Sequence, residues 1–191
     1  MKNHFRGWKT KDVLAVGAIS RAQTGFSFVS RCLDEYPHGT LRAEVVSPPY
    51  SRQINILIAY NFELILNSLM FMGSLNNTES DLIEEAKVGH RLDVLWNKIK
   101  STSKKDLFGI KNIQLKNKDV FKFYEIEFED RKIVTVHDLN NIRYDINDFR
   151  NKETTKLRSS ISDEENMVTT AETLEKLRKN IMNDIYKKYK T

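Results

Sequence analysis

The longest apolar run of the chain, residues 54–72, constrains the fold more than any other feature. It reads INILIAYNFELILNSLMFM, and three polar residues, Asn61, Glu63 and Asn67, lie inside it. A helix that is apolar on nearly every side belongs in the centre of a bundle or in a membrane. A buried carboxylate without compensation is costly, so Glu63 needs a partner or water. The run therefore predicts a central helix around which the other elements pack.

The same run is long enough to be considered as a membrane span. A charged residue at the centre of a span costs roughly 2.5–3.5 kcal/mol on insertion scales, and Glu63 would lie there with two asparagines. No second apolar span follows, and residues 1–12 contain no apolar core of a signal peptide. Cys32 is the only cysteine, so no intramolecular disulfide can form, which fits a reducing compartment. We therefore expect a cytoplasmic protein that does not enter the membrane.

Helical periodicity accounts for most of the chain. With 7 Gly and 3 Pro in 191 residues, the chain has few breakers, which favours helices over a many-turned β architecture. Gly17 and Gly25 weaken the first helix, and we expect one of them to mark a bend or a close contact between helices. Apolar residues at helical spacing predict helices over residues 11–35, 51–73, 79–87, 90–100, 137–149 and 170–190.

One segment has the alternating pattern of a β-strand instead of helical spacing. Residues 121–128 read FKFYEIEF, and a β-branched stretch follows at residues 132–136, which predicts a β-hairpin. Residues 110–115 would add a third strand. The chain is therefore expected to be mainly α, with a helical bundle domain over residues 1–149 and a small β insertion at about residues 110–136.

The last part of the chain is polar before it becomes helical again. Residues 150–167 are expected to form a linker, and residues 168–191 a C-terminal amphipathic helix. The apolar stripe of that helix is Leu174, Leu177, Ile181, Ile185 and Tyr189. A terminal helix with one stripe docks onto its own domain or onto a second copy of it. The sequence leaves both arrangements open.

Three short segments of the chain, residues 61–67, 89–99 and 142–144, resemble the motifs of one known family. Asn61-Phe62-Glu63-Leu64, followed by Leu66-Asn67, resembles the N-x-E-x-x-L-K pattern of helices in the HEPN-domain superfamily. Residues 89–99, GHRLDVLWNKI, resemble the G-H-x-L-x-x-L-[WF]-x-K-[LI] segment of that group, and Ile142-Arg143-Tyr144 resembles its I-R-Y patch. The resemblance covers residues 11–149. It implies a HEPN-like helical bundle that is cytoplasmic and often a homodimer.

The resemblance also implies a function class. Many HEPN proteins are ribonucleases of toxin–antitoxin or phage-defence systems, and others are partners of small nucleotidyltransferases. The ribonucleases carry R-x(4–6)-H at the start of a late helix, where only Arg131 and His137 have this spacing downstream of the central run. Their setting departs from the pattern, because Arg131 falls at the tip of the predicted hairpin. If the chain is a nuclease, His137 would be the base and Arg131 or Arg143 the phosphate-binding cation.

A second set of polar residues has two interpretations. Asn61, Glu63, His90 and Arg143 would form a pocket that receives a phosphate or a base, or they would hold the bundle together. In the structural interpretation Glu63 pairs with Arg143, Asn61 bonds the backbone of a neighbouring helix, and the His90 ring bonds a nearby carboxylate or carbonyl.

Composition narrows the chemistry only slightly. The formal charge of +5 is compatible with RNA or nucleotide binding and equally with a basic protein that binds neither. Neither zinc-ligand spacing nor a glycine-rich phosphate loop occurs, so we expect no metal and no cofactor. The leading hypothesis is an RNA- or nucleotide-directed role. The alternative is a non-catalytic interaction module, acting as a homodimer or with a nucleotidyltransferase partner.

Overall fold

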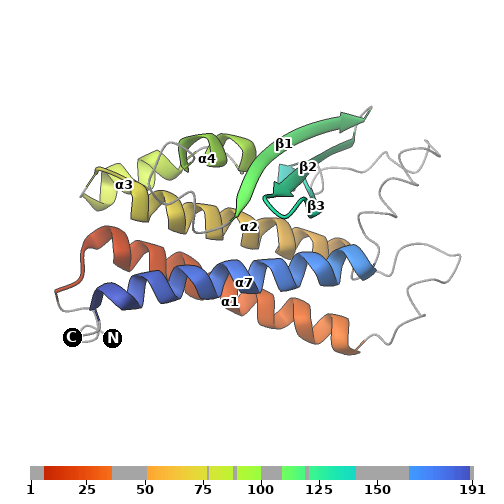
Figure 1. The fold of residues 1–191 in the computed structure, drawn as a ribbon, viewed down its shortest axis with the longest axis horizontal. Helices are drawn as coiled ribbons and strands as arrows, with labels where there is room; N and C mark the ends of the chain where they lie inside the picture. Colours follow the sequence, from red (N-terminus) through yellow and green to blue (C-terminus); the bar gives the residue numbers. More distant parts are fainter. Residues whose placement is uncertain are drawn as a thin grey trace, which may run out of the picture.

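The computed structural model describes residues 7–35, 51–76, 78–87, 90–99, 109–118, 121–140 and 164–189, and these form five helices and three strands (Figure 1). Their order is α1 (Thr10–Glu35), α2 (Ser51–Gly73), α3 (Glu79–Ala86), α4 (Leu92–Ile99), β1 (Ile110–Lys118), β2 (Phe121–Phe128), β3 (Ile133–His137) and α7 (Glu164–Tyr189). The predictions of a mainly helical fold and of a small antiparallel sheet are confirmed.

Helix α2 is the centre of the fold, as its apolar run predicts. It contacts α1, α3, α4, α7 and β3. Helices α1, α2 and α7 lie side by side along the length of the molecule, and α3, α4 and the sheet cover the other side of α2 (Figure 1). Phe62, Leu66 and Leu69 of α2 are completely buried because they face these neighbours.

Among the described residues, α2 alone is long and apolar enough to cross a membrane. Within its most apolar window, 67% of the residues are buried inside the fold, which is the pattern of a core helix. This is consistent with a soluble protein.

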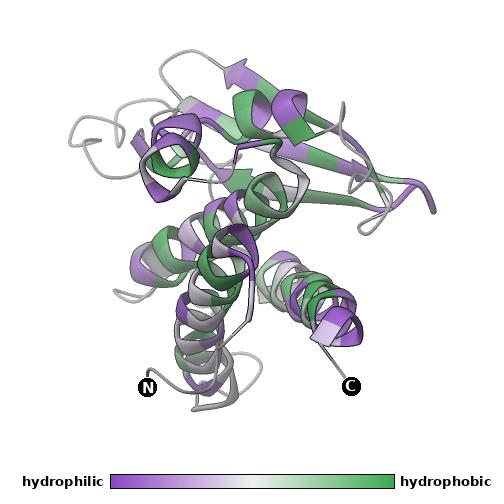
Figure 2. Ribbon diagram, turned by 90° about the vertical axis from the view of Figure 1, so that its left-hand side faces the viewer, coloured by the Kyte–Doolittle hydropathy of each residue, from purple (hydrophilic) through white to green (hydrophobic). Residues whose placement is uncertain are grey.

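Helix α7 packs onto its own domain. It contacts α1, α2 and β3, and it carries both hydrophobic and hydrophilic residues (Figure 2). Its buried residues include Met167, Ala171, Leu174, Leu177, Ile181 and Ile185. The helix begins at Glu164, six residues before the predicted Thr170, because Met167 and Ala171 extend the apolar stripe at helical spacing. Residues 164–167, which the sequence assigned to a linker, therefore form the first turn of α7.

The three strands form an antiparallel sheet in the order β1-β2-β3. In the register, Ile126 of β2 lies opposite Ile113 of β1 and Val134 of β3, and all three are buried. Because alternate residues of a strand share a face, Tyr124 lies on the same face as Ile126 and is completely buried. The aromatic residues of β2 with described side chains belong to the core, so they are not exposed for stacking on bases.

The end of β3 differs from the prediction. His137 is the last residue of this strand and lies opposite Phe123, whereas the sequence placed it at the start of a helix. The reason is that the alternation of buried Val134 and Val136 continues the strand up to this residue. Helical conformation begins only at Leu139, and residues 141–150, including Arg143, lie outside the described residues.

Helix α7 also covers the free edge of β3. The Nδ2 of Asn166 donates to the carbonyl of Thr135 at 3.1 Å, and the Thr135 amide donates to Oδ1 of Asn166 at 3.5 Å. The side-chain amide thus replaces the neighbouring strand that an edge residue lacks.

Candidate functional site

Glu63 and His90 form the polar contact at the centre of the candidate site. The Nδ1 atom of His90 lies 2.5 Å from Oε2 of Glu63, which joins the middle of α2 to the residue two positions before α4. The Glu63 side chain is 15% exposed and the His90 side chain 33% exposed. Water can therefore reach the imidazole, while the carboxylate is mostly covered. The partner that Glu63 requires is His90 in this structure, as expected for a histidine that bonds a nearby carboxylate.

The backbone of His90 explains how the ring reaches α2. His90 has a φ of 60°, in the left-handed region that few residues other than glycine adopt. Its conformation turns the chain immediately before α4 begins at Leu92. A left-handed residue costs on the order of 1–2 kcal/mol, so the surrounding packing must hold it in place.

A second polar group lies next to His90 in the chain. Nε and Nη2 of Arg91 donate to the two carboxylate oxygens of Asp93, at 2.9 and 2.7 Å. This two-point contact raises the pKa of Arg91 and lowers the pKa of Asp93, because each charge stabilises the other. Both groups are therefore charged near neutral pH.

The Arg91–Asp93 pair lies within electrostatic reach of the sheet. The hydroxyl of Tyr124 donates to Oδ1 of Asp138 at 3.3 Å, and both residues are buried. Burial raises the pKa of the Tyr124 phenol, and the negative charges of Asp138 and Asp93 raise it further. The negative charge of Asp138 also helps to raise the pKa of Arg91. The four residues form one polar network between α4 and the end of the hairpin.

Sequence reasoning missed this network. The alternation of β2 carries a signal for Tyr124, because a residue two positions before buried Ile126 must share its face. Arg91, Asp93 and Asp138 carry no such signal. Their proximity depends on how α4 packs against the sheet, which no local pattern specifies.

Asn61 lies two residues before Glu63 but belongs to a different contact. It is 1% exposed, and among the described residues neither Oδ1 nor Nδ2 has a hydrogen-bond partner. Its amide packs against Gly25 of α1. The predicted hydrogen bond from Asn61 to the backbone of a neighbouring helix is therefore not observed, whereas a close helix contact at one of the two glycines is.

The predicted catalytic pair is not brought together. Arg131 is exposed at the turn between β2 and β3, and His137 is buried at the far end of β3. Five residues separate them along an extended strand, so their backbones lie on the order of 20 Å apart within one chain. Within the ranges that the structure describes, no group of three or more His, Cys, Asp or Glu side chains is arranged to hold a metal ion.

Comparison with protein-family models, with curated proteins and with solved structures gave no significant match.

Proposed function

We propose that this chain is a HEPN-like protein with an RNA- or nucleotide-directed role, and that Glu63 and His90 form its functional centre. The observation that carries the proposal is the 2.5 Å contact between these two residues. Glu63 belongs to the first segment that resembles the superfamily, and His90 belongs to the second. Two weak motifs, 27 residues apart in the chain, thus meet at one accessible polar contact.

The chemistry of the pair suits proton transfer. A carboxylate that accepts from Nδ1–H fixes the histidine tautomer and leaves the lone pair on Nε2. In metal-independent RNA cleavage, Nε2 would take the proton of a ribose 2′-hydroxyl, and the 2′-oxygen would attack the adjacent phosphorus. The 5′-oxygen would leave with a proton supplied by water, giving a 2′,3′-cyclic phosphate and a 5′-hydroxyl, and the proton on Nε2 would pass to the solvent. His90 replaces His137 as the proposed base, because His137 is buried.

Purified protein incubated with RNA in a metal chelator tests this assignment. We expect His90→Asn to lower the cleavage rate about 100-fold or more, since positioned general bases contribute roughly 10²–10⁴-fold. Asparagine tolerates the left-handed backbone, so this variant removes the imidazole without adding strain. Glu63→Gln should lower the rate less. The control is Glu84→Gln, which removes a carboxylate from the exposed Glu84–Lys87 ion pair and should leave cleavage unchanged. Wild-type protein that leaves RNA intact would contradict the ribonuclease assignment.

One observation favours the alternative, a non-catalytic interaction module. Arg131 lies in the turn before β3 and His137 lies at the end of β3, so the ribonuclease motif of the superfamily is not assembled within one chain. In that case the Glu63–His90 contact would only join α2 to α4. Glu63→Ala would then lower the free energy of unfolding by about 1.5–3 kcal/mol, as for a hydrogen bond to a charged group, with no RNA phenotype. Light scattering distinguishes the proposed homodimer from the 22.4 kDa monomer.

A further inference from the structure

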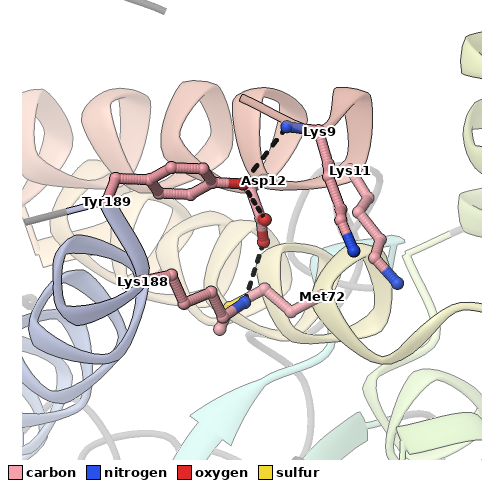
Figure 3. A pocket seen from close by; sticks show the side chains of 6 residues that line it. All are labelled: Lys9, Lys11, Asp12, Met72, Lys188 and Tyr189. Carbon is pink, nitrogen blue, oxygen red and sulfur yellow. Dashed lines mark hydrogen bonds and ion pairs between the residues drawn. The ribbon is translucent and has the colours of Figure 1, made fainter. Parts of the chain in front are cut away.

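A second polar site lies at the C-terminal end of α2. There the beginning of α1, the end of α2 and the end of α7 enclose a pocket of about 410 Å³ (Figure 3). Its lining residues are Lys9, Lys11, Asp12, Met72, Lys188 and Tyr189. Met72 is nine residues from Glu63 on the same helix, which corresponds to about 13 Å along the helix axis. The pocket is therefore separate from the Glu63–His90 contact.

Asp12 organises the floor of this pocket. It is 1% exposed, and its Oδ2 accepts a hydrogen bond from the Tyr189 hydroxyl at 2.5 Å. Its Oδ1 accepts from Nζ of Lys188 at 3.0 Å. The ring of Trp8 stacks on Tyr189 with centroids 4.2 Å apart, which holds the tyrosine from its other side. Both carboxylate oxygens are thus occupied, and the charge of Lys188 is compensated by Asp12.

Two other lysines remain with positive charge that no carboxylate of the pocket balances. Lys11 donates one hydrogen bond, to the neutral carbonyl of Ser74 at 3.0 Å. Within the part of the chain that the structure describes, the Lys9 ammonium has no ion-pair partner. Lys9 and Lys11 extend in the same direction from the start of α1 (Figure 3). The lining residues therefore carry three positive charges against one negative charge, which leaves a surplus of two.

From this arrangement we infer that the pocket binds the phosphate group of a small phosphomonoester. A phosphomonoester carries a charge of about −1.5 to −2 at neutral pH, which matches the two uncompensated lysines. Lysine binds phosphate as a point charge and needs no fixed fork geometry. The volume exceeds that of a bare phosphate and falls in the range of roughly 300–1,000 Å³ typical of small-molecule sites. Met72 supplies an apolar wall for the organic part of the ligand.

Isothermal titration of the full chain with glycerol 3-phosphate at constant ionic strength tests the inference. We expect the combined variant Lys9→Gln, Lys11→Gln to weaken binding at least tenfold. The matched control is Lys132→Gln, Lys176→Gln, which removes two positive charges from exposed residues outside the pocket and should bind like wild type. Lys9→Gln alone provides a variant whose folding should be unaffected, and it should weaken binding severalfold.

Three results would overturn the inference. The first is no heat of binding with wild-type protein. The second is equal weakening in the pocket variant and the control variant, which would mean that only the overall charge attracts the ligand. The third is binding to vesicles containing phosphatidic acid without binding to free glycerol 3-phosphate, which would indicate a membrane surface as the source of the phosphate. None of these readouts depends on RNA cleavage, so they are independent of the role proposed for His90.

Discussion

Gly25 of α1 and Asn61 of α2 lie so close that a β-carbon on residue 25 would be 2.5 Å from Oδ1 of Asn61. It would also lie 3.0 Å from Nδ2 and 3.2 Å from Cγ of the same side chain. Real β-carbons essentially never approach a non-bonded heavy atom of another part of the chain within 3.0 Å. The absence of a side chain at residue 25 therefore lets the two central helices approach around a buried amide.

Gly25→Ala should destabilise the protein although alanine favours helices. The clash with Asn61 should cost about 1–3 kcal/mol, as for overpacking of a core, and this exceeds the gain in helix propensity of about 0.8–1 kcal/mol. Gly17→Ala is the matched control in the same helix. Its β-carbon meets no atom within 4 Å, so the free energy of unfolding should rise by about 0.8–1 kcal/mol. Urea unfolding measures both changes.

The double variant Gly25→Ala, Asn61→Ala tests whether the clash with Asn61 causes the loss of stability. When Asn61 is replaced by alanine, the clash disappears and the change at residue 25 should no longer destabilise. If Gly25→Ala is as favourable as Gly17→Ala in the wild-type background, the close approach of α1 and α2 at this position is not correct.

Ile181→Ala in α7 should lower the free energy of unfolding by about 2–5 kcal/mol, the usual cost of truncating a buried isoleucine. Ile181 is completely buried because α7 packs against α1 and α2. Asn183, two residues further along α7, is exposed, and its replacement by alanine should change stability by less than about 0.5 kcal/mol. A loss below 1 kcal/mol for Ile181→Ala would indicate that α7 does not dock onto its own domain in solution.

Acid should lower the free energy of unfolding by protonating Asp93. Its contact with Arg91 lowers the folded-state pKa below the ordinary value of 3.8, so the unfolded chain takes up this proton at a higher pH than the folded chain. The stability contributed by Asp93 is therefore present above about pH 4 and is lost as the pH falls through the folded-state pKa. Urea unfolding from pH 6 to pH 3 should show a smaller acid dependence for Asp93→Asn than for wild type. Glu172→Gln, a change at an exposed residue of α7, should retain the wild-type slope.

Arg131→Gly should stabilise the hairpin by about 1 kcal/mol. Arg131 has a φ of 69° at the turn between β2 and β3, where glycine avoids the steric cost that other residues pay. Lys132→Gly at the next position is the control and should destabilise by roughly 0.5–1 kcal/mol, because this residue lacks a positive φ. If Arg131→Gly abolishes RNA cleavage while stabilising the fold, Arg131 is the catalytic cation after all, reaching RNA from the hairpin tip.

Much of the fold could be predicted from local patterns. Helical spacing located α2 and its end at Gly73. The alternation of apolar and polar residues located the hairpin. The prediction failed where this alternation gives way to helical spacing, since His137 ends a strand instead of starting a helix. The residues before this boundary alternate as in a strand, and the residues after it have helical spacing. The conformation of the boundary residue therefore depends on tertiary packing.

The sequence by itself determined where most of the described helices and strands lie, because periodicity is a local property of neighbouring residues. It also indicated that Glu63 needs a partner or water, because a covered carboxylate is costly anywhere in a core. Only the tertiary structure decided that the partner is His90, that Tyr124 meets Asp138, and that α7 closes the pocket around Asp12. These contacts join residues between 14 and 177 positions apart. Such pairings follow from how whole helices and strands pack together, and no short stretch of sequence contains that information.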